Sequence, residues 1–310
     1  MSGLNSTITL RDGNTIPFIG FGPGMYVTHL KWPKHPRTPY GILQRIYNRY
    51  HGIPKSRNGY IESIAKAIEN GFRLIDYSET YGDYRYIKEG IKQSGVSRNE
   101  LFLTTRVGNQ QQFQGVGRIR ESFLRGLETL GIEYFDLLQF HWPVTDIYTD
   151  TWLEMRKIRD EGLVKTLGVA NCNIHHLEEL HRVSGEWPVI NQFEIHPLFT
   201  QKPLIEYCKQ KGITVEAYTA IARYDDRLVR LPILKNIAAK YNKNLIQIVL
   251  RWHIQNGVIP IVRSMNPQHQ KSNLDIFDFT LSDEEMRLID SININSRLRY
   301  DPDNCDFSIL

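Results

Sequence analysis

The sequence predicts a single (β/α)8 barrel, in which eight parallel strands are each followed by a helix. Short apolar runs rich in Ile, Leu, Phe and Val recur along the chain, which is typical of parallel strands buried on both faces. Segments with helical periodicity alternate with these runs, and no linker separates them. The 310 residues, 41% of them hydrophobic, suit a fold that needs about 250 residues in one domain.

The first predicted elements are a hairpin and a helix. Residues 6–18 are expected to form a β-hairpin, in which Asp12 and Gly13 supply the positive φ of a tight primed turn. The segment NGYIESIAKAIENG is expected to form the first helix because its apolar residues share one helical face. Asn58 is its predicted N-cap, and Gly71 lies just past its end.

The remaining elements alternate in order. An extra helix is expected before the last strand, and a final helix is expected to start at Ser282, followed by an acidic first turn. The later strands are expected within 72–76, 101–105, 134–140, 164–170, 188–194, 213–219 and 258–262. The helices are expected within 83–93, 118–130, 150–162, 175–183, 202–212, 231–242, 244–257 and 282–292.

Composition and cysteine usage argue against several classes of protein. Three cysteines, Cys172, Cys208 and Cys305, lack metal-ligand spacing, and their odd number argues against a disulfide framework. No apolar stretch approaches a membrane span, and the N-terminus lacks a signal-peptide pattern. A net charge of +4 is too small to indicate nucleic-acid binding. We therefore expect a cytoplasmic, metal-free enzyme that is a monomer or a weak homo-oligomer and binds neither membrane nor nucleic acid.

Four polar residues stand at or just after the ends of predicted strands. They are Asp76, Tyr81, Arg106 and His141. In a (β/α)8 barrel the carboxyl ends of separate strands supply the catalytic groups. The alternative for Asp76 and Arg106 is a structural ion pair, and the alternative for His141 is a core histidine with satisfied hydrogen bonds. Their joint occurrence favours an active site.

These four positions resemble the active site of the aldo-keto reductases, where an aspartate, a tyrosine, a lysine and a histidine surround the nicotinamide. The resemblance extends from about residue 15 to about residue 290, and it includes the segments LGVANCN, INQFEIHP, EAYTAI and IVRSMNPQHQKSN. It implies an NAD(P)H-dependent oxidoreductase that reduces an aldehyde or ketone to an alcohol. An arginine, Arg106, stands where the family has its lysine.

The resemblance implies a role for each of the four residues. Tyr81 would be the acid, Asp76 would hold Arg106, and His141 would orient the carbonyl. A tyrosine has a pKa of about 10, and a neighbouring cation is expected to lower it. Arginine is planar and does not present a compact ammonium, so slow reduction or an activated substrate is expected.

The resemblance also implies a cofactor site. Asn171 and Gln192 would bond the carboxamide and Tyr218 would stack on the ring, while Ala170 replaces a serine and removes one bond. A 2′-phosphate favours guanidinium contacts, so Arg263 favours NADP(H) over NAD(H), although His269 replaces the usual arginine. The alternative explanation for Asn171 and Gln192 is ordinary polarity at the ends of strands. For Arg263 and His269 it is a basic loop exposed to solvent. The candidate cofactor residues are Gly22, Asp76, Asn171, Gln192, Tyr218, Thr219, Ile221, Arg263, Ser264, Met265, Asn266, His269 and Asn273.

An insertion at residues 26–57 follows the first strand, at the expected catalytic mouth. It contains seven Lys or Arg residues and five aromatic residues but no Asp or Glu. A loop this long is commonly a lid or a binding element. We hypothesise that it selects an anionic substrate, with Arg45, Arg49 and, after the fourth strand, Trp142 as substrate contacts. An oligomer contact or a solvated loop is the alternative.

Two other functions stay open at this point. One is a cofactor-binding protein of the same fold with low or no turnover, acting as a sensor or partner subunit. The other is a redox-neutral enzyme that uses a retained cofactor. The arginine at position 106 favours the first of these, whereas Tyr81 and His141 favour the reductase.

Overall fold

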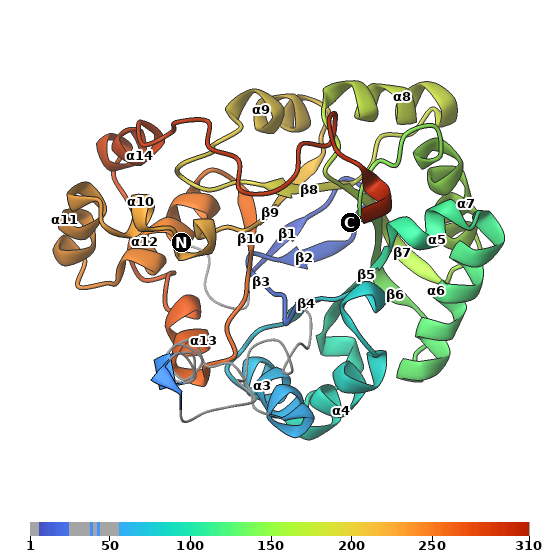
Figure 1. Ribbon diagram of the computed structural model, residues 1–310, viewed down its shortest axis with the longest axis horizontal. Coiled ribbons are helices and arrows are strands. Elements are labelled where there is room, and N and C mark those ends of the chain that lie inside the picture. Colours follow the sequence, from blue (N-terminus) through green and yellow to red (C-terminus); the bar gives the residue numbers. More distant parts are fainter. Residues whose placement is uncertain (1–5, 25–37, 40–41, 44–55, 310) are drawn as a thin grey trace.

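The computed structural model describes residues 6–24, 38–39, 42–43 and 56–309. Eight strands form a closed barrel in the order β10-β3-β4-β5-β6-β7-β8-β9, and every neighbouring pair is parallel. Helices surround it (Figure 1). The predicted (β/α)8 barrel is confirmed. The strands are β3 (Gly20–Phe21), β4 (Leu74–Asp76), β5 (Phe102–Val107), β6 (Phe135–Phe140), β7 (Val164–Ala170), β8 (Ile190–Glu194), β9 (Thr214–Tyr218) and β10 (Val258–Val262).

The helices between the strands lie where the apolar periodicity places them. Each buries one stripe against the barrel, and the largest buried side chains include Trp152 of α7 and Trp252 of α12. The main helices are α3 (Arg57–Glu69), α4 (Tyr84–Ser94), α6 (Val116–Leu130), α7 (Tyr148–Asp160), α8 (Ile174–Ser184), α9 (Lys202–Gln210), α11 (Pro232–Lys240), α12 (Leu245–Gln255), α13 (Pro267–Leu274) and α14 (Asp283–Asp290). Shorter helical turns are α5 (Asn109–Phe113), α10 (Asp226–Val229), η1 (Glu79–Tyr81), η2 (Arg98–Glu100), η3 (Ala222–Tyr224) and η4 (Phe307–Ile309).

The N-terminal hairpin closes one end of the barrel. Strands β1 (Thr7–Thr9) and β2 (Thr15–Pro17) pair antiparallel, and Ile16 packs in one cluster with barrel residues such as Leu74. The predicted primed turn is wrong in one respect, because only Gly13 has a positive φ, of 85°. Asp12 instead accepts hydrogen bonds from the Asn14 backbone and from Thr166 of β7, so its side chain ties the turn to the barrel.

The ends of two helices test the predicted caps. Helix α3 begins at Arg57, and its N-cap is Ser56, whose side chain accepts a hydrogen bond from the Gly59 backbone. The predicted cap at Asn58 is therefore wrong, because Asn58 lies inside the first turn. Helix α14 is capped by Ser282 as predicted, in a capping box with Glu285.

Most of the predicted insertion lies outside the described residues. This includes Arg45 and Arg49, the two arginines that the anionic-substrate hypothesis names. Among the residues that the structure describes, no helix is both long enough and apolar enough to span a membrane.

Candidate active site

The four predicted catalytic residues converge at the carboxyl end of the barrel. Asp76 ends β4, Tyr81 ends η1, Arg106 lies near the end of β5, and His141 directly follows β6. The Arg106 guanidinium pairs end-on with the Asp76 carboxylate, Nη1 to Oδ1 at 2.5 Å and Nη2 to Oδ2 at 2.7 Å. The Tyr81 hydroxyl lies 3.1 Å from His141 Nε2. A cation, a carboxylate, a phenol and an imidazole therefore share one site.

The Arg106–Asp76 pair is buried, with 4% and 5% of the two residues exposed. Further hydrogen bonds stabilise a buried ion pair, and here they are incomplete, because Arg106 Nε has no hydrogen-bond partner among the described residues. Arg106 Nη2 also donates to Gln192 Oε1 at 2.8 Å, from β8. Nη2 thus bonds both the carboxylate and the amide, while Nη1 of the planar guanidinium faces the second carboxylate oxygen.

The protonation states of Tyr81 and His141 follow from their burial. Burial raises the pKa of Tyr81 above its ordinary value, and the positive charge of Arg106 offsets only part of this effect. The predicted net lowering of the Tyr81 pKa by the cation is therefore wrong. Burial, with Arg106 and Arg299, lowers the pKa of His141 to about 3. At neutral pH the pair is a protonated phenol beside a neutral imidazole.

The residues predicted to bond the nicotinamide carboxamide already have protein partners. Asn171 donates to the His141 carbonyl at 2.9 Å and accepts from the Tyr218 hydroxyl at 2.6 Å. Gln192 donates to Glu216 at 2.9 Å and to Asp76 at 3.3 Å. Because an amide oxygen has two lone pairs, Gln192 Oε1 keeps one for a further donor. Asn171 links the candidate cofactor side to His141.

The residues predicted for the phosphate end follow β10, on the loop that leads to α13 and on that helix, and β9 is the neighbouring strand. The Arg263 guanidinium lies over Gly24, where a Cβ added to the glycine would meet the Arg263 Cζ at 3.0 Å. Helix α13 follows, with Asn266 as its N-cap. Met265 and Asn273 are buried, whereas His269 is exposed. The other candidates in this region are Gly22 beside β10, and Thr219 and Ile221 after β9.

Two buried polar residues of the barrel interior were not predicted as site residues. Glu216 of β9 is fully buried, and burial together with the charge of Asp76 raises its pKa to about 7. Gln139 of β6 is equally buried and donates to Glu216 at 3.1 Å. The available signal was a glutamate or glutamine inside an otherwise apolar strand, where an unpartnered polar group is costly.

The C-terminal segment crosses the mouth of the barrel. The fully buried Glu194 at the end of β8 accepts hydrogen bonds from the backbone of Leu298 at 2.7 Å and of Arg299 at 2.9 Å. Trp142, which follows His141, makes ring contacts with Tyr300 and Phe307. In Figure 1 this red segment runs from α14 along α9 and α8 and ends beside α5. Trp142 therefore lies under the tail, and Arg299 is held beside the site.

The tail is also tied to the start of α8. Asn173 donates to Asp303 at 2.7 Å, and His175 Nε2 lies 3.3 Å from the same carboxyl group. His176 is close as well, and these three side chains could be taken for a metal site. However, His176 Nδ1 accepts the Asn173 backbone N–H, so the ring proton is on Nε2 and no lone pair faces a metal. The cluster acts as a latch for the tail.

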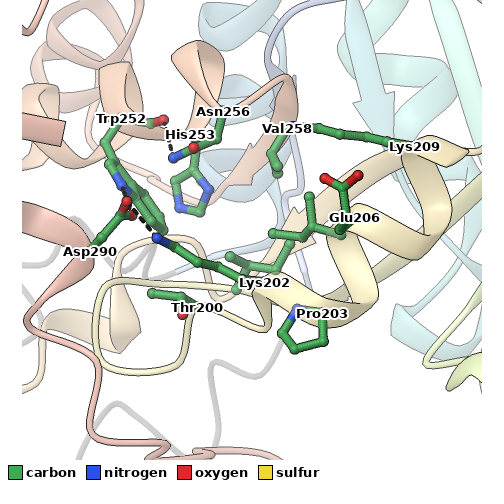
Figure 2. A pocket seen from close by; sticks show the side chains of 12 residues that line it. Thr200, Lys202, Pro203, Glu206, Lys209, Trp252, His253, Asn256, Val258 and Asp290 are labelled. Carbon is green, nitrogen blue, oxygen red and sulfur yellow. Dashed lines mark hydrogen bonds and ion pairs between the residues drawn. The ribbon is translucent and has the colours of Figure 1, made fainter. Parts of the chain in front are cut away.

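A separate cavity of about 490 Å³ lies outside the barrel, between α9 and α12. Lys202 and Trp252 both contact Asp290 at its edge, at 2.7 and 2.9 Å (Figure 2). Its lining contains none of the four candidate catalytic residues. The lining residues are Ile195, Thr200, Lys202, Pro203, Ile205, Glu206, Lys209, Trp252, His253, Asn256, Val258 and Asp290.

Comparison with known proteins agrees with this geometry. The chain is 41% identical over 258 residues to glyoxal reductase of Bacillus subtilis, covering 83% of this chain and 92% of that protein. It is 33% identical over 300 residues to methylglyoxal reductase of Escherichia coli K12, covering 96% and 97%. A Bombyx mori aldo-keto reductase solved in complex with NADP superposes with a TM-score of 0.79 at 31% identity, covering 98% of this chain and 97% of that one. The profile of the aldo/keto reductase family matches residues 48–294, and the chain belongs to this family.

Proposed function

We propose that this protein is an NADP(H)-dependent reductase that converts a small aldehyde or ketone to the alcohol. The observation that carries the proposal is the Tyr81 phenol on His141 Nε2, beside the buried Arg106–Asp76 pair. The glyoxal and methylglyoxal reductases among the relatives support the reaction class, and the NADP complex of the Bombyx mori enzyme supports the cofactor. The substrate is expected to be a small carbonyl compound of this kind.

Each residue has a distinct task in the proposed reaction. NADPH, when bound, supplies the hydride that reduces the carbonyl carbon. Tyr81 donates its proton to the carbonyl oxygen, and Arg106 stabilises the phenolate that this leaves. Neutral His141 holds the Tyr81 hydroxyl in place. The carbonyl oxygen is thereby oriented toward the phenol. Asp76 holds the Arg106 guanidinium in position beside the site.

The residues at the ends of β9 and β10 suit a dinucleotide. Gly22 and Gly24 allow Ile261 and Arg263 to pack closely against the backbone here, since a Cβ at either position would crowd one of these side chains. Arg263 and Ser264, at the start of the loop before α13, would hold the 2′-phosphate, because a guanidinium binds phosphate in a bidentate manner. Gln192 Oε1 and Asn171 would face the carboxamide, and Tyr218 the ring.

The proposal is tested with the purified protein, NADPH and a panel that includes glyoxal, methylglyoxal and simple aldehydes and ketones. We expect NADPH oxidation matched by alcohol formation, and a lower KM for NADPH than for NADH. Binding of NADPH without turnover on any carbonyl would favour the sensor or partner alternative. Product formation without net NADPH consumption would favour the redox-neutral alternative.

We further propose that the preferred substrate is anionic. Arg299 supports this, because the Glu194 carboxylate holds its backbone beside the site and its charge acts on both Tyr81 and His141. Within residues 56–309, no carboxylate forms an ion pair with the Arg299 side chain, although Tyr300 contacts it. Arg45 and Arg49 would add to this positive charge, in keeping with the basic composition of the insertion.

Replacing Arg299 with alanine is expected to raise KM for a carboxylated aldehyde such as glyoxylate by about tenfold, the loss of one charge-assisted hydrogen bond. KM for a neutral aldehyde of similar size should change less than about twofold. Arg299→Lys should retain most of the discrimination. The matched control is Arg297→Ala on the same tail, whose guanidinium lies over Phe199 instead. Equal losses on both substrates would contradict the proposal.

A further inference from the structure

A chain of buried polar groups continues from Arg106 into the barrel interior. Arg106 donates to Gln192 Oε1, and Gln192 Nε2 donates to Glu216 Oε2 at 2.9 Å. Gln192 and Glu216 are register partners on β8 and β9, so both project into the barrel at the same level. The Glu216 carboxyl group is therefore one amide away from the guanidinium.

Glu216 is also held from the opposite wall of the barrel. Gln139 donates to Glu216 Oε2 at 3.1 Å, although β7 and β8 separate their two strands. Gly168 of β7 lies beside this crossing, and a Cβ there would be tightly placed, 3.2 Å from Gln139 Cγ. Gln139 is itself the register partner of Arg106 on β5. The hydrogen-bond network therefore starts at Arg106 on β5 and returns to Gln139 on the neighbouring strand, β6.

These contacts leave Gln192 only one favourable orientation. Its amide nitrogen faces two carboxylates, at 2.9 Å from Glu216 and 3.3 Å from Asp76, while its oxygen faces Arg106. A flipped amide would point N–H groups at the guanidinium and an oxygen at both carboxylates. Glu216 therefore fixes the orientation of the Gln192 amide, whose oxygen accepts the hydrogen bond from Arg106 Nη2.

The charge balance of the site singles out Glu216. The charged groups that act on it are Asp76 from β4 and Arg106 from β5, while β6 and β8 contribute the uncharged Gln139 and Gln192. Asp76 and Arg106 neutralise each other, so an ionised Glu216 would be an excess charge in the interior. Its Oε1 is buried without a hydrogen-bond partner in the described part of the chain, so the ionised carboxylate would place charge on an atom that no donor there stabilises. Its pKa of about 7 agrees with this balance.

We propose that Glu216 is a positioning residue that acts on Tyr81 through Gln192 and Arg106, and that its proton sets how strongly Arg106 favours the phenolate. When Glu216 is neutral, the positive potential of Arg106 at Tyr81 is opposed only by Asp76. When Glu216 ionises, its charge cancels part of that potential, and Tyr81 becomes a weaker proton donor. The reductive rate should therefore fall as pH rises through the titration of Glu216. This inference rests on the proposed reductase function.

The first test is the pH profile of kcat for wild type and Glu216→Gln. For wild type we expect a fall of up to about tenfold between about pH 6 and about pH 8, as for one group titrating near 7. Glu216→Gln should lack this limb, because its amide carries no titrating proton. Gln139→Leu should move the limb to higher pH, because it removes a donor that favours the carboxylate. Unchanged profiles in both variants would overturn the proposal.

A second measurement does not require activity. A carboxyl whose pKa is raised on folding binds its proton more tightly in the folded chain, so stability falls as pH rises from its unfolded pKa of about 4.3 towards 7. The Tm of the cofactor-free wild type should therefore decline over this window more steeply than that of Glu216→Gln. If Tm declines with pH equally in both proteins, Glu216 does not titrate in this range and the proposal is overturned. If the slopes differ but no variant reduces any carbonyl, it is the reductase function that fails.

Discussion

Tyr81→Phe is expected to lower kcat for carbonyl reduction by about 10² to 10⁴-fold, the usual contribution of a positioned general acid. The phenol lies 3.1 Å from His141 Nε2, and burial keeps it protonated at neutral pH, so its removal leaves the carbonyl oxygen without that proton donor. Affinity for NADPH should change little, because the hydroxyl is not one of the proposed cofactor ligands. Steady-state kinetics and NADPH fluorescence titration measure the two effects separately.

The matched control for this prediction is Tyr77→Phe. Tyr77 makes a ring contact with Tyr81, with centroids 6.1 Å apart, but its hydroxyl lies near the Asp83 carbonyl and away from His141. Losing this hydroxyl should leave kcat within a few-fold of wild type. If both variants lose activity to the same extent, the effect is one of packing and Tyr81 is not the acid.

The second large effect is expected from Arg106→Met. This change leaves the Asp76 carboxylate buried without its cation, which should cost about 3–5 kcal/mol of the free energy of unfolding. The rate of reduction should also fall, because the cation with the largest effect on Tyr81 is lost and only the smaller effects of Arg299 and Arg263 are left to stabilise its phenolate. Denaturant unfolding gives the stability, and kcat at a temperature where the variant is folded gives the activity.

Two further variants separate the charge of Arg106 from its shape. The double variant Asp76→Asn with Arg106→Met should recover much of the stability, because no unpaired charge is left, but it should not recover activity. Arg106→Lys keeps the charge but loses the second nitrogen, which faces Asp76 Oδ1, so the pair is held less firmly and kcat should fall several-fold. A rise in kcat would instead show that the arginine is only a poorly tuned substitute for a lysine.

The strand order of the barrel could be predicted because local patterns carry it. Apolar runs of four to seven residues, alternating with amphipathic segments, admit few arrangements besides a parallel barrel. The helix boundaries depend on more than local pattern, as the helix α3 cap shows: Ser56 and Asn58 are both good capping residues, and only the entry path of the chain selects between them. The same holds for Asp12, whose partner Thr166 is distant in sequence.

The candidate catalytic residues could be found in the sequence because each follows a recognisable strand end, but their protonation states could not. The predicted effect of Arg106 on Tyr81 was correct in sign, yet burial outweighs it, and burial depends on how the whole barrel packs. Glu216 and Gln139 lie within apolar strands and gave no sign of which side chain each would meet. Their contact crosses the barrel beside Gly168, where a Cβ would crowd both Ile190 and Gln139.

The amino-acid sequence by itself therefore determined the barrel, its N-terminal hairpin and the four polar residues at its carboxyl end, because periodicity and strand-end chemistry are local. The tertiary structure alone decided the fork between Arg106 and Asp76, the neutral state of His141, the passage of the tail over Trp142 and the interior path to Glu216. Each of these depends on distances between strands and on exclusion of water, which arise only when the barrel closes.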